Sequence, residues 1–523
     1  MWTLLKKETL ENLITMRFII GFLACNLVFG LITYVLMQDF QLELSRVSTA
    51  QEQSREATES WRVWSRVRPT IVKQPSILAV FGSNMGTNWG KRVWITHTRI
   101  PVLTTDETGD AGSTDLLAFL YEFDYTHIVQ ILVSLIALLL SFDALSGEKE
   151  RGTLRQVLSN SIKRTTVFLS KFLGAFIALL IIVLTASIIS LFIYLLHLPR
   201  TPVVEEWVSI VLIVAAGIVF GTVFIALGMM VSTFTSKTSS ALIVCMLVWV
   251  MLVIVLPNSV GFLSSTFGFS QDLVDYQRGL DALDNEYADK MQMFVPLRDF
   301  TFFADYYLSP EGRIRFTVMG DNYLKLHLER QQPAIDAQFE YAVKRYDLEK
   351  DFRDGRAQKM TLSNILLMLS PSTLYGNVVN ALARVDAANH EAFMEQARLY
   401  REEVISFIRS NGGYSTKRWF TFDRDDASYR DRIRELEKLT MEEYGHITRE
   451  DPDFYTTLQS WIMEMYRHPE AVLDLSAMPK FAFRPLPLAD VVKNTWFDFF
   501  LLIVVFSIVI VVSYIRFLSY DPR

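Results

Sequence analysis

The chain has 523 residues and a formal net charge of −6, and 51% of its residues are hydrophobic while 21% are charged. Its mean hydropathy is +0.24, whereas a soluble chain of this length normally divides into several domains and has a mean hydropathy below zero. Disorder requires low hydrophobicity and nucleic-acid binding requires a basic surface, so the composition argues against both. The two cysteines, Cys25 and Cys245, lie in apolar runs, which excludes a disulfide scaffold and a cysteine zinc site.

Apolar residues gather in runs of the length that a membrane-spanning helix needs, which is roughly 20 residues. A secretory signal peptide is an alternative for the first run, but no small-residue cleavage site follows it, so we expect a retained helix. The predicted spans are residues 14–37, 127–145, 167–196, 207–231, 239–256 and 497–515.

Basic residues flank these runs in a pattern that predicts their orientation. They precede the first run, fill the loop between the second and third, stand between the fourth and fifth, and follow the sixth. Because short loops rich in Lys and Arg stay in the cytoplasm, we expect both termini and these two loops there. The basic residues are Lys6, Lys7, Arg17, Lys149, Arg151, Arg155, Lys163, Arg164, Lys171, Lys237, Arg516 and Arg523.

Two long segments, residues 38–126 and 261–495, are then placed outside the cytoplasm. The larger one has apolar residues recurring at three and four, for example in 336–356 and 429–445, which predicts helices. The smaller one contains a mixed region, residues 80–102, that predicts short strands and turns. The expected fold is an α-helical polytopic membrane protein with six transmembrane helices, cytoplasmic N- and C-termini, and a mainly helical extracytoplasmic domain built from two long loops.

Two apolar stretches outside these spans need an interpretation. Residues 362–382 are broken by Pro371 and Gly376, and a seventh span there would place the basic flank of the last span outside. We expect this stretch to be core of the outer domain or an interfacial helix, with a re-entrant helix as the alternative. The aromatic residues 300–307 are expected to be core rather than a site for an apolar or peptidic substrate.

No segment has the pattern of a nucleotide-binding loop, GxxxxGK followed by Ser or Thr. The sequence LSGEK at residues 145–149 resembles the LSGGQ signature of ABC ATPases, but it ends a membrane helix and has no phosphate loop beside it, so we expect no ATP contact. The seven histidines form no HExxH motif or close pair, and no GxSxG elbow is present. We therefore predict no catalytic residue and no metal ligand.

The loop between the second and third spans is the most informative part of the chain. A compact mixed-charge group, Glu148–Arg151, stands at the membrane edge. Gly152 can turn the chain and open a short amphipathic helix with Leu154, Val157 and Leu158 on one side. Such a helix can lie along the membrane or insert into the groove of a partner. An ordinary solvated loop obeying the positive-inside rule is an equal alternative.

Three further patterns add to this loop. Residues Leu4 to Glu8 precede the first span, and Arg516 to Asp521 follow the last. Leu369-Ser370-Pro371-Ser372 and Asn380-Ala381-Leu382-Ala383 lie in the larger outer segment. In the loop itself the pattern consists of Asp143, Leu145, Ser146, Gly147, Glu148, Glu150, Gly152, Thr153, Leu154, Leu158, Ser159, Arg164 and Lys171. Together these residues resemble the type 2 permeases of ABC exporters, and in particular a subgroup with long outer loops.

The resemblance implies a transmembrane permease subunit of an ATP-driven exporter in the bacterial inner membrane. It implies two ABC ATPase subunits as partners, which bind ATP and Mg, and a second permease copy, identical or related, against the first and fifth helices. Lipid and a periplasmic or outer-membrane protein are further expected partners, and nucleic acid is not. A membrane-anchored receptor, scaffold or enzyme acting through the outer domain is the alternative. The ATPase-coupling residues that the resemblance implies are Glu148, Lys149, Glu150, Arg151, Gly152, Thr153 and Leu154.

The expected organisation adds an amphipathic elbow helix over residues 1–13, a coupling-helix loop over 146–166 and a cytoplasmic tail over 516–523. Glycines at 217, 221 and 228 are expected to permit close helix packing rather than to mark a pore. Arg17 and Asp143 are expected to reach water from the membrane edges. Five polar residues either face a substrate path or, as we expect, bond to their own helices: Asn26, Thr33, Thr185, Ser187 and Ser190.

Overall fold

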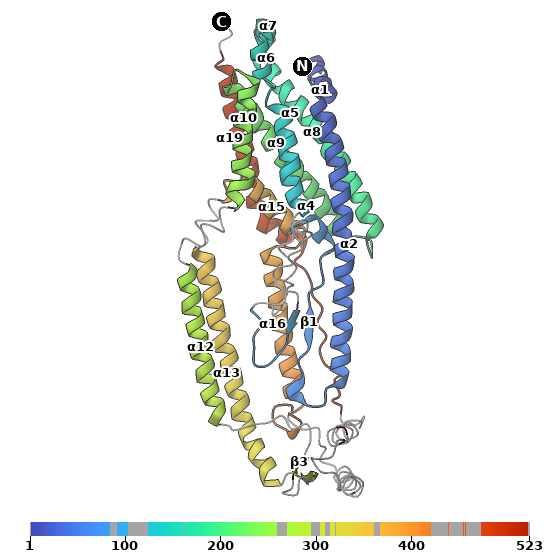
Figure 1. The fold of residues 1–523 in the computed structure, drawn as a ribbon, viewed down its shortest axis with the longest axis vertical. Helices are drawn as coiled ribbons and strands as arrows, with labels where there is room; N and C mark the ends of the chain where they lie inside the picture. Colours follow the sequence, from blue (N-terminus) through green and yellow to red (C-terminus); the bar gives the residue numbers. More distant parts are fainter. Residues whose placement is uncertain are drawn as a thin grey trace.

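Figure 1 shows an elongated molecule with a helix bundle at one end and a second group of elements at the other. The structure is a computed structural model. It describes residues 2–83, 92–102, 124–159, 162–258, 269–293, 304–308, 314–318, 321–359, 367–419 and 472–520, and Lys438, Asp453 and Thr456 singly.

The bundle is made of long helices, two of which contain a short π-helical segment, called η4 and η5. Its elements are α1 (Trp2–Ile14), α2 (Met16–Ser60), α4 (Tyr125–Ile128), η4 (Val129–Val133), α5 (Ser134–Ser141), α6 (Ser146–Arg151), α7 (Thr153–Ser159), α8 (Arg164–His197), α9 (Val204–Phe234), α10 (Thr238–Trp249), η5 (Val250–Val255), α15 (Pro371–Leu382) and α19 (Leu488–Leu518). Both chain ends, α6 and α7 lie at the same end of the molecule, which we call the loop end; the opposite end is the domain end (Figure 1).

The second group of elements combines helices with two small antiparallel sheets, β1–β2 and β3–β4. Thr70 pairs with Trp94 in the first sheet, and Ala304 pairs with Val318 in the second. Its elements are η1 (Trp64–Arg66), β1 (Thr70–Val72), η2 (Ile77–Phe81), β2 (Arg92–Trp94), α12 (Phe269–Met293), β3 (Ala304–Leu308), β4 (Ile314–Val318), α13 (Asp321–Lys359), α16 (Ala387–Ser410) and η6 (Lys417–Trp419).

Among the described residues, six helical stretches are long and apolar enough to cross a membrane, which confirms the predicted helical polytopic fold. Both termini lie at the same end, as an even number of spans requires (Figure 1). The stretches are Met16–Ser60, Tyr125–Arg151, Arg164–His197, Val204–Phe234, Thr238–Asn258 and Leu488–Leu518.

Helix α2 is much longer than the span predicted at its start. It has 45 residues, which at a rise of about 1.5 Å per residue is roughly twice the thickness of a bilayer core. Residues 38–60 contain no Gly or Pro, so nothing in the sequence ends the helix where the apolar run stops. The second half of α2 therefore extends through the domain end, next to β1 and roughly alongside α16 (Figure 1).

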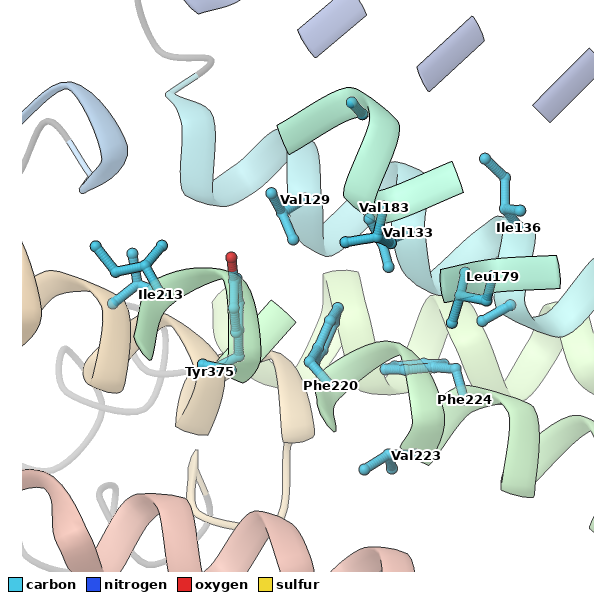
Figure 2. Close-up of a cluster of buried hydrophobic side chains, with 14 of the residues drawn as sticks. Val129, Val133, Ile136, Leu179, Val183, Ile213, Phe220, Val223, Phe224 and Tyr375 are labelled. Carbon is cyan, nitrogen blue, oxygen red and sulfur yellow. The ribbon is translucent and has the colours of Figure 1, made fainter. Parts of the chain in front are cut away.

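The centre of the bundle is formed by α9 and by the continuous helix α4–η4–α5. In their most apolar windows 61% and 67% of residues are buried within the chain, against 17% for both α10–η5 and α19. Figure 2 shows Val129 and Val133 of η4 near Leu179 of α8, Phe220 of α9 and Tyr375 of α15. The outer helices thus keep apolar faces for lipid or for another protein.

Helix α15 closes the domain end of the bundle. Its N-cap residue, Ser370, donates a hydrogen bond through Oγ to the carbonyl of Leu252 in η5, at 2.6 Å. Gln130 in η4 donates through Nε2 to the carbonyl of Ser372, at 2.9 Å. The Tyr375 ring stacks on Phe220 with centroids 4.8 Å apart. α15 is therefore held by both π-helical segments and by the central helix.

The apolar stretch 362–382 is thus core at the junction between domain and bundle rather than a seventh span. The helix has only 12 residues, too few to cross a bilayer, and Pro371 occupies its first turn. Its residues 362–366 lie outside the described part of the chain.

A second core lies away from the membrane spans and packs α16 against η1, β1, β2 and α13. Phe393, Met394 and Ala397 of α16 are fully buried in it. The predicted helix over residues 336–356 is confirmed as part of α13, and the strand expected in 80–102 is β2. The helix expected at 429–445, apart from the single residue Lys438, and the side chains of the aromatic stretch 300–307 lie outside the described residues.

Most of the polar side chains singled out inside the spans donate hydrogen bonds to backbone carbonyls of their own helix. Asn26, Thr33 and Thr185 each donate to the carbonyl four residues earlier in their own helix, at 2.7, 2.7 and 2.9 Å. Ser190 donates instead to the carbonyl of Phe29 in α2, at 3.4 Å. The expectation of bonding within the helix is confirmed for the first three, and Ser190 links two helices.

The glycines of α9 differ in what surrounds them. A Cβ at Gly221 would lie 3.0 Å from Cγ1 of Val133, and one at Gly228 would lie 3.1 Å from Cβ of Ser141. A Cβ at Gly217 would meet nothing closer than 3.8 Å. Close packing against the neighbouring helix is thus confirmed at the first two positions.

We expect Gly228→Val to destabilise the protein by about 1–3 kcal/mol, because the added methyl groups overpack the contact with α5. Gly217→Ala on the same helix is the matched control and should stay close to the wild type. Thermal unfolding of the purified protein in detergent measures both. Equal midpoints for the two variants would contradict the packing assigned to Gly228.

Candidate functional site

The loop between the second and third spans projects past the bundle at the loop end (Figure 1). It consists of two short helices, α6 and α7, joined at Gly152, whose φ of 72° lies in the left-handed region. The Gly152 N–H donates to the carbonyl of Lys149 at 3.2 Å and ends α6. Glycine adopts this conformation without steric cost, so the sequence itself sets the turn between the two helices.

Three buried charges join this loop to two other helices. The Lys171 ammonium in α8 donates to Glu148 Oε1 in α6 at 2.6 Å, and to both carboxylate oxygens of Glu8 in α1 at 3.0 and 3.1 Å. The side chains of Lys171, Glu8 and Glu148 are only 4%, 10% and 13% exposed. Because a buried charge is costly unless it is paired, the three groups hold each other in place. We call them the loop-end triad.

A glycine allows the triad to form. A Cβ at Gly174 in α8 would lie 3.0 Å from Glu8 Cβ and 3.2 Å from the Glu8 carbonyl carbon. The backbone of α1 therefore lies directly against α8, one turn away from Lys171. Backbone atoms cannot rotate aside as a side chain can, so this approach requires glycine.

Lys149 fastens the loop to the end of α9. Its ammonium donates to the carbonyls of Ser232, Thr233 and Thr235 at 3.1, 2.6 and 3.0 Å. These carbonyls have no partners within the helix, and a cation there is further stabilised by the helix dipole. Ser232 also accepts through Oγ from the backbone N–H of Ser146 at 2.8 Å. The segment that resembles LSGGQ is thus packed into the end of the bundle.

Glu150 fastens the loop to the start of α10. Its carboxylate accepts from the backbone N–H and the hydroxyl of Thr238 at 2.9 and 2.7 Å. Just before α6, Asp143 pairs with Arg17 of α2 at 2.7 Å. The structure therefore brings together two residues that were expected to reach water separately.

Helix α7 has two different faces. Leu154 is fully buried, and Val157 and Leu158 pack partly buried against the same cluster, so the predicted apolar side is confirmed. The opposite face is exposed and carries Thr153, Arg155, Gln156 and Ser159. The other buried members of the cluster are Leu145, Val167, Phe168, Met229 and Phe517.

The end of α19 completes the site. Arg164 at the start of α8 donates to the carbonyls of Leu518 and Tyr520 at 2.7 and 2.8 Å. The Lys149 ammonium lies 5.4 Å from the centre of the Tyr520 ring. The loop is therefore in contact with both terminal helices, although they are far apart in the sequence.

The seven residues singled out from the sequence thus fall into two groups. Glu148, Lys149, Glu150 and Leu154 attach the loop to the bundle, whereas Arg151, Gly152 and Thr153 are exposed. Their partners Lys171, Glu8, Ser232 and Thr238 were not among the site residues. A signal existed for Lys171, because a charge at the edge of an apolar span requires a partner.

We expect Lys171→Met to destabilise the protein by about 3–5 kcal/mol, since it leaves two buried carboxylates without a counter-charge. Combining it with Glu8→Gln and Glu148→Gln should restore most of the loss, because no buried charge remains. Chemical unfolding of the purified variants measures this. A triple variant no more stable than Lys171→Met would contradict the role assigned to the triad.

The fold and the loop can be compared with known proteins. The family model described as "ABC-2 family transporter protein" matches residues 2–521, which includes α1, all six spans, α6, α7 and the domain between the last two spans. No curated protein sequence matches the chain. Because the match extends over nearly the whole chain, the protein belongs to the ABC-2 family and is a multi-pass membrane permease of an ABC transporter.

Proposed function

We propose that this permease is the membrane subunit of an exporter and that α6 and α7 couple it to separate ATPase subunits. The observation that carries the proposal is the loop geometry: an exposed helix face is held on a base that the buried triad fixes to α1 and α8, the half-buried Lys149 fixes to α9, and the exposed Glu150 fixes to α10. A solvated loop would not need these contacts. A loop that must transmit force between two proteins needs such contacts.

The exposed face of α7 is the surface we propose for docking. An amphipathic helix that keeps its apolar face on its own protein presents polar residues to a groove on the partner. ATP and Mg²⁺ bind in the ATPase and not in this chain. In support, the LSGEK segment is bonded to Ser232 inside the bundle end, away from any surface where a nucleotide would lie.

Movement of the ATPase subunits would then pass through rigid contacts. The triad connects α6 to α8 and α1, Lys149 connects it to α9, and Glu150 connects it to α10. ATP shifts the permease between states only through differential contacts in those states, so a loosely attached loop could not transmit the energy.

The surroundings of the permease are part of the proposal. The loop end carries the basic loops and faces the cytoplasm of a bacterium, and the domain end lies outside the inner membrane. Two ATPase copies and a second permease copy complete the transporter, with α2 and α10 at the interface. These helices expose apolar residues such as Leu23, Leu27, Ile243 and Leu247, which a second copy or lipid would cover.

Export is the direction we propose. The support is the resemblance of the loop to exporters and the position of the domain, which stands where a substrate would leave. The domain then serves as an exit cap or as a contact for a periplasmic or outer-membrane protein.

The turn at Gly152 provides the sharpest test. We expect Gly152→Val to reduce the amount of ATPase that co-purifies, because a β-branched residue does not tolerate φ of 72° and α7 would change direction. Gly152→Asn is the matched control, since Asn adopts this conformation readily. The assay uses ATPase candidates from the same gene neighbourhood and also measures ATP hydrolysis by the complex.

No atom lies within 4 Å of a Cβ at Gly152, so neither substitution creates a clash in the bundle. The thermal midpoint of the permease alone should therefore change little in Gly152→Asn, whereas in Gly152→Val it should fall, because redirecting α7 withdraws Leu154 from its buried cluster. If Gly152→Val retains ATPase as well as the wild type does, α7 is not the coupling element.

A further inference from the structure

A large cavity lies at the domain end, outside the site described above. Its volume is about 1350 Å³, and it is only partly enclosed; its lining comes from the second half of α2, β1 and the following residues, the α8–α9 turn, and the segment over 472–485. Figure 1 shows β1, which supplies part of the lining, beside α2. Sites for drug-sized ligands measure about 300–1,000 Å³, so there is room for a larger molecule.

Most of the cavity wall is apolar. Phe40 and Leu44 line it from α2, Ile71 from β1, and Leu473, Phe481 and Phe483 from the segment before α19. Apolar walls of this extent favour an apolar occupant over water, because water finds few hydrogen-bond partners there.

The charges at the cavity are mainly positive. Five basic side chains line it against two acidic ones, although the whole chain has a net charge of −6. Positive charges in a concave, apolar setting attract anions more strongly than they would on an open surface. The basic residues are Arg55, Lys73, Arg200, Arg384 and Lys480.

The three arginines are already neutralised within the protein. Arg200 pairs with Glu206 at 2.7 Å, and Arg384 pairs with Glu205 at 3.0 Å. Arg55 pairs with Glu52 at 2.5 Å. The lysines are the charges that remain for a ligand.

Lys73 differs from the other cations because it is half-buried in an aromatic wall. Its ammonium lies 5.8 Å from the ring centre of Phe393 and 6.0 Å from that of Phe483, and no described carboxylate lies within ion-pair distance. Burial lowers the pKa of Lys73 to about 8, against the opposing charge of Asp386. Asp386 Oδ1 caps α16 by accepting from the backbone N–H and the side-chain amide of Asn389.

One end of the cavity lies at the level where the spans leave the apolar part of the bundle, and from there the cavity extends along α2 as far as Glu59. Pro199 and Arg200 follow the end of α8, and Glu206 is in the first turn of α9. Phe40 lies just past the apolar part of α2. At this level acyl chains and their head groups are both within reach.

We propose that this cavity binds a lipid whose acyl chain lies along the apolar wall and whose anionic head group pairs with Lys73. An anion at this point pairs with an ammonium that has no ion-pair contact among the described residues, and the chain covers the aromatic and aliphatic side chains of the wall. The proposal does not depend on the coupling role of α7, and its test needs no ATPase.

The full-length protein in a neutral detergent can be titrated with cis-parinaric acid, a fatty acid that fluoresces when its chain enters an apolar site. Lys73→Met keeps the length of the side chain and removes its charge, and we expect it to weaken binding about tenfold or more. Lys350→Met, on the exposed surface of α13, is the matched control and should bind like the wild type. The methyl ester of the same acid should bind weakly and respond little to Lys73→Met.

A second variant addresses the apolar wall. Leu44→Trp fills part of the cavity and should reduce parinarate binding, and Gln51→Trp, at an exposed position of the same lining, serves if Leu44→Trp does not fold. Mass spectrometry of lipid extracted from the purified protein identifies the source: a phospholipid indicates the bilayer, and a free fatty acid indicates a soluble pool. Parinarate binding that is equal in wild type and Lys73→Met, or unaffected by either tryptophan, would overturn the proposal.

Discussion

The loop-end triad is the constraint on which the arrangement of the loop end depends. Lys171 lies 163 residues from Glu8 and 23 residues from Glu148, yet both carboxylates converge on its ammonium away from water. In a medium of low dielectric constant the loss of any one partner is costly, so α1, α6 and α8 cannot shift independently. The contacts made by Lys149 and Glu150 then follow, because the same short helix already lies beside the ends of α9 and α10.

The domain end is held together in a different way. There α15 packs its apolar side chains into the bundle core and makes neutral hydrogen bonds, such as those from Ser370 to Leu252 and from Gln130 to Ser372, and Arg384 just after it pairs with Glu205 of α9. Their partners lie in η4 and η5, and the two helices are also joined by the Trp249 indole N–H, which donates to Ser134 Oγ at 2.8 Å. π-Helical turns expose backbone carbonyls to other donors and recur where helices change shape. Buried charges thus fix the loop end, whereas apolar packing and neutral hydrogen bonds contribute most of the contacts of α15 at the domain end.

The sequence predicted the parts of this architecture that depend on local pattern. Apolar runs located the six spans, and Gly152 with Leu154, Val157 and Leu158 predicted a turn followed by an amphipathic helix. The partners of those residues depend on tertiary packing. Nothing near Lys171 in the sequence indicates that Gly174 lets Glu8 approach it, and the Cβ distances that make this glycine necessary exist only in the folded chain. The extent of α2 was missed for a different reason: residues 38–60 contain no Gly or Pro, so the helix continues past its apolar run.

Helix α2 connects the two ends of the molecule. It begins beside α1, pairs with Asp143 through Arg17, and reaches the lipid cavity with Phe40 and Leu44, all within one uninterrupted helix of 45 residues. No proline interrupts its hydrogen-bond ladder, so one continuous helix links the loop end with the cavity wall. The wall that faces α2 belongs to the segment before α19, whose helix ends beside Arg164 at the loop end. Both walls of the cavity are therefore attached to helices with contacts at the loop end, so packed helices connect the two ends of the molecule.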